Sequence, residues 1–159
     1  MSTALILHSV KEAEYCVQQR LHDGCLLLST NPCVDVYLKE RHGIECQCVS
    51  RFLTHAELSA DIQTASDAVD RVLASLDEKV APFLNEQLGL KMRYFTPAYS
   101  FLGKHYLLGL VAFISALKKI AATHQVDTIR IFDTQYQDFL NTDPAMASLI
   151  ARFLPGVAC

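Results

Sequence analysis

The stretch that decides the fold is residues 4–49, ALILHSVKEAEYCVQQRLHDGCLLLSTNPCVDVYLKERHGIECQCV. It contains short apolar runs at residues 4–8 and 25–29 and a third predicted strand at residues 44–49, and the segments between them have helical spacing. Short continuous runs without a polar alternation are typical of strands that are buried on both faces of a parallel sheet. The alternation of strand and helix therefore predicts an α/β fold with an open, mostly parallel small sheet.

The two helices of this stretch have recognisable start and stop signals. The first begins at a capping box, S-V-K-E, whose first residue is Ser9, and we expect it to run to about His22, before Gly24. The second begins at Pro32, behind a capping Thr30 or Asn31, and we expect it to end at His42, before Gly43.

The pattern changes after residue 49. A second capping box at residues 54–57 opens a long apolar stripe (Val69, Leu73, Leu76, Val80, Phe83 and Leu88), which we expect to be a helix that is broken or bent at Pro82. We expect an aromatic connection at residues 91–104, then an apolar helix to residue 124. A fourth strand at 127–133 and a last helix opening at Asp143 complete the pattern. We interpret residues 1–159 as a single Rossmann-like α/β domain with an added helical layer, the excursion at about 54–124. Another strand–helix unit could follow, so we expect a fragment of a longer protein.

Composition limits the possible partners. The net charge is −3 and the chain has no basic run, so we expect no nucleic acid partner. The longest uncharged apolar run, residues 106–117, is too short to span a bilayer, so we expect no membrane span. The six cysteines lie mostly among apolar residues and no signal peptide is visible, so we expect free thiols in the cytoplasm.

The sequence contains none of the short motifs that mark a dinucleotide site, a P-loop, a nucleophile elbow or a zinc protease. Cys46 and Cys48 form a C-x-C pair, which we interpret as buried thiols because structural zinc sites need a second ligand pair. We therefore expect no metal site and no cofactor.

Candidate site residues lie where strands end, because ligands of open α/β sheets bind at the carboxyl ends of the strands. These candidates are His8, Ser9, Ser29, Thr30, Asn31, Arg51 and Asp133. Helix capping is the alternative role for Ser9 and for Thr30 or Asn31. The alternative for His8 is a half-buried residue at a strand end, and the alternative for Asp133 is a turn. Tyr99 belongs to the aromatic segment, which could line a sugar-binding groove or fill a core under a long loop.

The order of these segments resembles the N-terminal halves of bacterial surface-carbohydrate biosynthesis proteins with the two-Rossmann-domain glycosyltransferase architecture. The resemblance extends from residue 26 to residue 133. The residues that carry it are Ser29, Thr30, Pro32, Val34, Tyr37, Leu38, Gly43 and Ile44.

The resemblance implies an acceptor-side domain of a glycosyltransferase-like protein of cell-surface polysaccharide biosynthesis. Its partners would be a sugar acceptor and a missing C-terminal domain that binds the nucleotide-sugar, and alone it should not turn over substrate. The base for displacement at the sugar carbon would be His8 or Asp133. The alternative hypothesis is a non-catalytic α/β binding or interaction module, flavodoxin-like or receiver-like.

Overall fold

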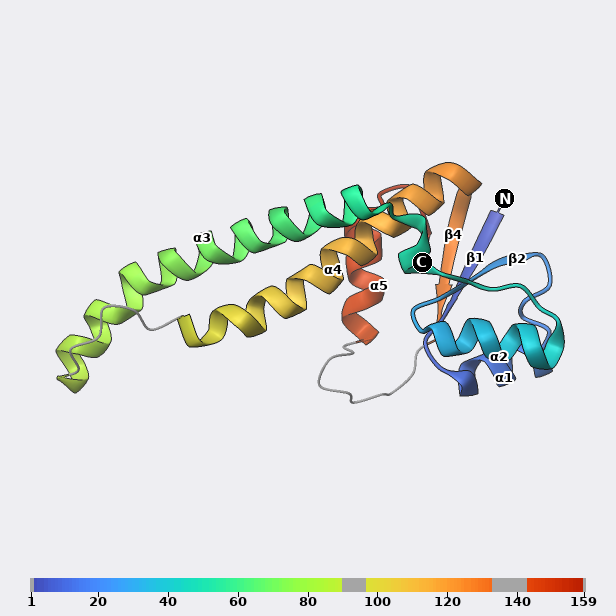
Figure 1. Cartoon of the computed structure of the whole chain (residues 1–159), viewed down its shortest axis with the longest axis horizontal. Coiled ribbons are helices and arrows are strands. Elements are labelled where there is room, and N and C mark those ends of the chain that lie inside the picture. Colours follow the sequence, from blue (N-terminus) through green and yellow to red (C-terminus); the bar gives the residue numbers. More distant parts are fainter. Residues whose placement is uncertain (1, 90–96, 133–142, 159) are drawn as a thin grey trace. The chain divides into compact units, whose positions relative to one another are not determined.

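The computed structural model of the chain (Figure 1) describes residues 2–89, 97–132 and 143–158. The chain divides into two compact units. The first, residues 1–54 together with 113–159, contains the sheet, and we call it the sheet unit. The second, residues 55–112, is called the helical unit.

The sheet has four parallel strands in the order β3-β2-β1-β4. They are β1 (Ser2–Leu7), β2 (Cys25–Ser29), β3 (Gln47–Cys48) and β4 (Val126–Ile131). Leu5 of the central strand β1 pairs with Leu27 on one side and with Arg130 on the other. This topology confirms the predicted α/β class, with a small, open, Rossmann-like sheet.

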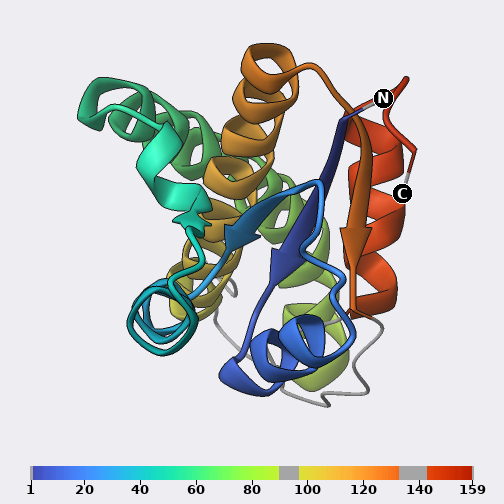
Figure 2. The ribbon, with the colours of Figure 1, turned by 90° about the vertical axis from the view of Figure 1, so that its right-hand side faces the viewer.

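Helices cover both faces of the sheet because strand residues alternate between the faces (Figure 2). α1 (Val10–Gln18) and α2 (Pro32–His42) cover one face. The residues buried there are Leu5, Leu7, Ala13, Cys16, Leu27, Val34 and Leu38. The last turns of α4 (Pro97–His124) and α5 (Asp143–Phe153) cover the other face. Its buried residues are Ala4, Ile6, Leu28, Val49, Ala116, Leu117, Ile120, Val126, Ile129, Ile150 and Leu154.

Helix α1 ends at Gln18, so the prediction that it continues to His22 was wrong. Arg20 takes a left-handed backbone conformation, with φ at 54°, and ends the helix there. The Leu21 amide donates to the Cys16 carbonyl at 2.9 Å and the Arg20 amide to the Val17 carbonyl at 3.1 Å, which is a Schellman motif. Leu21 packs against the core, and this contact holds the turn without a glycine.

Helix α2 has the predicted ends. The side chain of Asn31 accepts a hydrogen bond from the Cys33 amide at 3.0 Å, and Pro32 occupies the first turn. Gly43 closes the helix with φ at 66°, a conformation that costs a glycine little. The predicted inward residues Val34 and Leu38 are fully buried.

Strand β3 is much shorter than the predicted run at residues 44–49, because only Gln47 and Cys48 pair with β2. The Ile44 amide donates instead to the Leu38 carbonyl at 3.2 Å and so helps to close α2. On the other side, a 3₁₀ turn, η1 (Val49–Phe52), ends the pairing.

The opposite edge of the sheet is partly covered after α5. Ala158 forms a parallel bridge with Thr128 at the outer side of β4. The Ala158 amide donates to the Asp127 carbonyl at 2.9 Å, and the Ile129 amide donates to the Ala158 carbonyl at 2.8 Å. These bonds satisfy backbone groups that an uncovered edge strand leaves exposed.

In the helical unit, α3 (His55–Leu88) is continuous through Pro82, so the helix is not broken there, and the predicted alternative of a bend stays a prediction. The predicted stripe is only partly inward, because Val69 is buried whereas Phe83 and Leu88 are 59% and 63% exposed. Helix α4 begins at Pro97 and not near residue 104, so residues 97–103 are helix and not a connection. Proline suits the first turn of a helix because its missing N–H has no partner there anyway.

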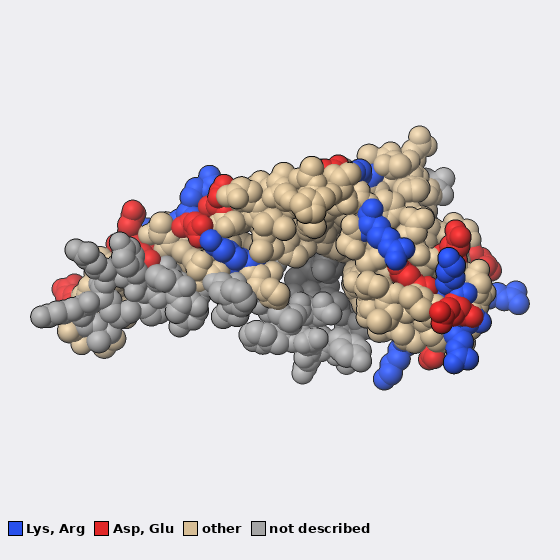
Figure 3. Space-filling view, viewed as in Figure 1, with Lys and Arg blue, Asp and Glu red and all other residues tan. Residues whose placement is uncertain are grey.

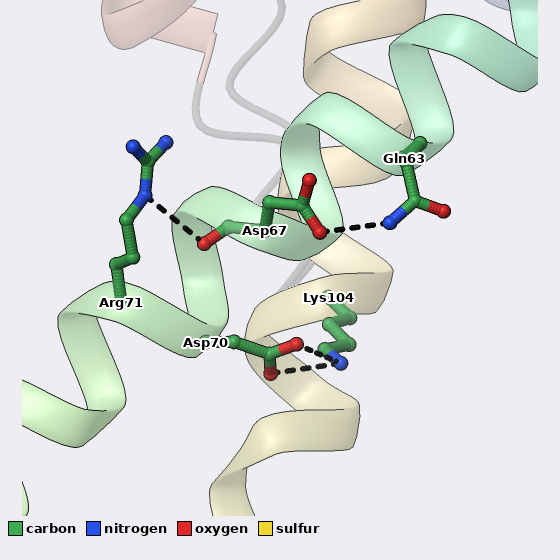
Figure 4. A network of polar contacts seen from close by, with 5 residues as sticks. All are labelled: Gln63, Asp67, Asp70, Arg71 and Lys104. Atoms are coloured by element: carbon green, nitrogen blue, oxygen red, sulfur yellow. Dashed lines mark hydrogen bonds and ion pairs between the residues drawn. The ribbon is translucent and has the colours of Figure 1, made fainter.

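The two helices of this unit are joined by a close approach and an ion pair (Figure 4). A Cβ atom on Gly103 would lie 3.3 Å from a methyl group of Val69, so α4 approaches α3 closely at this glycine. One residue on, the Lys104 ammonium lies 2.8 Å from both carboxylate oxygens of Asp70. The Gln63 side chain donates to Asp67 within α3, so this bond stabilises one helix, whereas the Lys104–Asp70 pair joins the two helices.

Helix α4 includes a segment, Gly103–His124, that is long and apolar enough to cross a membrane. The core helix of a soluble protein has the same length and composition. Ala116, Leu117 and Ile120, in the last turns of α4, are at most 1% exposed in the sheet unit. Packing against the sheet therefore accounts for the apolar character of these turns.

Candidate functional site

The polar groups of greatest interest lie at the carboxyl edge of the sheet. All four strands are parallel, so their carboxyl ends lie at one edge. Helix α1, which follows β1, covers one face, whereas α5, which follows β4, covers the other. The switch point therefore lies between β1 and β4, and ligands of such sheets bind in the crevice at that point.

His8 and Thr30 come together at this edge, at the ends of β1 and β2. The Nδ1 atom of His8 lies 2.8 Å from Oγ1 of Thr30, within hydrogen-bond distance. Backbone pairing sets the two residues beside each other, because the Thr30 amide donates to the Leu7 carbonyl at 3.0 Å. His8 is half-buried and Thr30 is exposed, so the pair is accessible from solvent.

The backbone at His8 is held by Glu12, the last residue of the predicted capping box. Oε2 of Glu12 accepts a hydrogen bond from the His8 amide at 2.6 Å, and the Glu12 side chain is buried. The Ser9 hydroxyl accepts from the Glu12 amide at 3.2 Å. These two bonds form a capping arrangement that fixes the direction in which α1 leaves β1.

Ser9 and Asn31 both cap helices, as the alternative interpretation predicted. Each side chain accepts from a backbone amide of the helix that follows it. Thr30 does not cap a helix and contacts His8 instead. Among the residues at these two strand ends, His8 and Thr30 are therefore the ones whose polar groups face each other and the solvent.

A second polar cluster lies on the other side of β2, beside β3. The hydroxyl of Ser29, which is fully buried, donates to Oδ1 of Asp35 in the first half of α2. Asp35 is only 7% exposed, and within the described part of the chain its Oδ2 atom has no hydrogen-bond partner. A buried carboxylate oxygen without a donor is energetically costly, so this group needs an explanation.

A pocket of about 280 Å³ adjoins Asp35. Its walls come from α2, from the segment before β3 and from η1. The charged residues that line it are Asp35, Lys39, Glu45 and Arg51. Of these, Arg51 was predicted as a site residue. The exposed side chains of Lys39 and Arg51 have no ion-pair partner among the residues that the structure describes.

The thiol of Cys46 lies in the same pocket and keeps its proton. Burial raises its pKa, and the negative charge of Asp35 together with a hydrogen bond to it raises the pKa further, to about 12. Reactive cysteines and metal ligands are thiolates, so Cys46 is unsuited to either role near neutral pH. Over residues 2–89, 97–132 and 143–158, no three His, Cys, Asp or Glu side chains are grouped to hold a metal ion.

The remaining features of the surface are less specific. On the face shown in Figure 3, Lys and Arg are interspersed with Asp and Glu and form no basic stripe of the kind that binds phosphate backbones. The five cysteines that the structure describes, Cys16, Cys25, Cys33, Cys46 and Cys48, are all free thiols.

For two predicted site residues, Tyr99 and Asp133, a role at this edge stays a prediction. The backbone of Tyr99 lies in α4, within the helical unit, so Tyr99 belongs to a different unit from the strand ends. Asp133 lies outside the described residues.

Asp35 and Lys39 were missed by sequence reasoning, although one signal was present. Asp35 stands directly after the inward Val34 and three residues before the inward Leu38, so it borders the buried stripe of α2. An acidic residue at the border of a buried stripe indicates a partly buried carboxylate, which needs a hydrogen-bond donor. Lys39 follows Asp35 by one helical turn and lies on the same side of the helix. The adjacency of Ser29 and Cys46 depends on strand pairing and could not be read locally.

No protein-family model, curated protein or solved structure matches the chain. The functional argument therefore depends on the geometry of the carboxyl edge.

Proposed function

We propose that the sheet unit is a sugar-binding domain that holds an acceptor sugar at the carboxyl edge of its sheet. The observation that carries this proposal is the contact between Nδ1 of His8 and Oγ1 of Thr30 at 2.8 Å, next to the switch point of the sheet. In open α/β sheets ligands bind at this carboxyl edge, in the crevice at the switch point, and His8 at the end of β1 borders that crevice.

The chemistry of the pair suits hydroxyl groups. A threonine hydroxyl both donates and accepts, and a neutral imidazole has one donor and one acceptor nitrogen. With Nδ1 engaged by Thr30, Nε2 of His8 is the ring atom left for a ligand. An imidazole in this position can accept the proton of an acceptor hydroxyl as that oxygen bonds to the sugar carbon of a nucleotide-sugar and the nucleotide leaves, which is general-base catalysis.

The full proposal is an acceptor-side domain of a glycosyltransferase-like protein of bacterial cell-surface polysaccharide biosynthesis, in the cytoplasm. Its support is the resemblance of residues 26–133 to the N-terminal halves of such proteins, together with the parallel sheet and the contact between His8 and Thr30. In this proposal a second domain binds the nucleotide-sugar, so the chain alone binds the acceptor without transferring a sugar to it.

Saturation-transfer NMR of the purified chain with glucose, galactose and N-acetylglucosamine tests the proposal. We expect at least one of these sugars to receive saturation, and the signal to be lost in His8→Ala and in Thr30→Val. His42→Ala is the matched control, because His42 is exposed and contacts Tyr37 away from the strand ends. Absence of any signal in the native chain, or an equal signal in His8→Ala, would contradict the proposal.

A non-catalytic interaction module is the second candidate function, and one observation favours it. Large apolar side chains of α3 are exposed, namely Leu58, Ile62, Val72, Leu76, Phe83 and Leu88. Exposed apolar side chains in such numbers are typical of surfaces that contact another molecule. Light scattering distinguishes the candidates: a chain that stays monomeric at high concentration counts against the interaction module.

A further inference from the structure

The pocket beside β3 has the properties of a second ligand site, distinct from the His8–Thr30 pair. It combines a buried carboxylate, Asp35, with two exposed cationic side chains, Lys39 and Arg51. Its volume of about 280 Å³ is near the lower limit of small-molecule sites, which suits a ligand the size of one sugar ring.

The Asp35 carboxylate sets one requirement on the ligand. Its Oδ1 atom accepts from the Ser29 hydroxyl, and the Cys46 thiol, a weak donor, also interacts with the carboxylate, whereas Oδ2 has no partner within hydrogen-bond distance in the described part of the chain. Because Asp35 is 93% buried and lines the pocket, a ligand that donates a hydrogen bond to Oδ2 offsets the cost of burying that oxygen. The ligand must therefore carry a donor.

Lys39 and Arg51 set a second requirement. Neither has an ion-pair partner among the described residues, and both line the pocket. A guanidinium group matches the geometry of a carboxylate, to which it donates two parallel hydrogen bonds. Glu45, which also lines the pocket, disfavours ligands with a dense negative charge. A single carboxylate therefore suits these residues better than a phosphate group.

We infer that this pocket binds a sugar acid, a ring that bears hydroxyl groups and one carboxylate. The carboxylate pairs with Arg51 and Lys39, and a hydroxyl donates to Asp35. The protonated thiol of Cys46, which lies beside Asp35, is a neutral wall of the pocket. This inference goes beyond the proposed function, because it stands even where neutral sugars fail to bind at His8 and Thr30.

Isothermal titration of the full chain with glucuronate tests the inference, with glucose, propionate and alanine as comparators. We expect glucuronate to bind at least tenfold more tightly than glucose, which lacks the anion, and than propionate, which lacks hydroxyl donors. Equal binding of propionate would reduce the pocket to a general anion site and overturn the inference. Binding of alanine without glucuronate would overturn it in favour of an ammonium ligand, and no binding of glucuronate would overturn it outright.

Variants locate the binding. Arg51→Gln is expected to weaken glucuronate about tenfold, whereas Arg41→Gln, an exposed change on α2 outside the pocket, leaves it unchanged. Asp35→Asn removes the buried acceptor charge while Ser29 keeps an oxygen to donate to, and a similar loss is expected. Cys46→Ala is expected to preserve or tighten binding, because it widens access to Asp35. An unchanged affinity in Arg51→Gln would overturn the inference even where Asp35→Asn fails to fold.

Discussion

Raising the pH to 9 in the presence of iodoacetamide tests the environment of Cys46 directly. Iodoacetamide reacts with the thiolate, so the rate follows the ionised fraction. With a pKa of about 12, roughly one Cys46 thiol in a thousand is ionised at pH 9. A thiol with the ordinary pKa of 9.0 is about half ionised at the same pH. The expected ratio of rates is therefore about 500-fold.

The assay is mass spectrometry of each cysteine peptide over time, with the exposed Cys33 as the internal reference. Cys46 is expected to react slowly in the folded protein and at an ordinary rate in urea. Asp35→Asn removes the neighbouring charge but not the burial, which is the larger cause of the raised pKa, so we expect Cys46 to react about tenfold faster in that variant.

Two results would refute this reasoning: a Cys46 rate within about threefold of Cys33 in the folded protein, or a rate that Asp35→Asn leaves unchanged.

The raised pKa also has a consequence for stability. Between pH 9 and about 12 the unfolded thiol loses its proton while the folded thiol retains it, so the free energy of unfolding falls as the pH rises through this range.

Three further predictions concern the scaffold. Ser9→Ala removes the cap of α1 and should lower the free energy of unfolding by about 1 kcal/mol in urea titrations; no change would mean that the capping bond is not stabilising. Leu28→Ala, at a fully buried position of β2, should cost about 2–5 kcal/mol in the same assay, and a cost below about 1 kcal/mol would contradict the described core. Gly103→Leu should force α4 away from Val69 and raise deuterium uptake in the middle of α3. Gly109→Leu should not, because an added Cβ there meets no neighbouring atom of the described residues within 4 Å beyond its own helix backbone; equal uptake in both variants would count against the close approach.

The sheet was predictable because its signals are local. Residues 4–8 and 25–29 are too short and too apolar for surface helices, and the capping groups at Ser9 and Pro32 mark where each helix begins. Parallel strands that are buried on both faces require helices on both sides, so the class of the fold follows from the alternation.

The errors arose where tertiary contacts override local signals. Helix α1 ends at Gln18, and the left-handed turn that follows uses Arg20 in place of a glycine because Leu21 packs in the core. Strand β3 is short because the amide of Ile44 is used to close α2. Helix α3 continues through Pro82, because a proline within a helix can kink it without ending it.

The candidate site was predictable only in part, for a similar reason. Sequence order identified His8 and Thr30 as strand-end residues but not as neighbours, because their contact depends on the register of β1 against β2. The pocket at Asp35 combines residues from α2, the segment before β3 and η1. None of these segments carries a recognised motif, so only the folded structure shows that they line one pocket.

Amide chemical-shift mapping of the labelled chain during a titration with N-acetylglucosamine tests the central claim most directly, because it reports where the ligand lies. We predict that the largest shifts occur at the carboxyl edge, at residues 8–9 and 29–31, with no comparable shift at residues 19–24, which precede β2 at the opposite edge of the sheet. Shifts that are largest at residues 19–24 or along α3, or a titration without saturable shifts, would contradict a sugar site at the carboxyl edge.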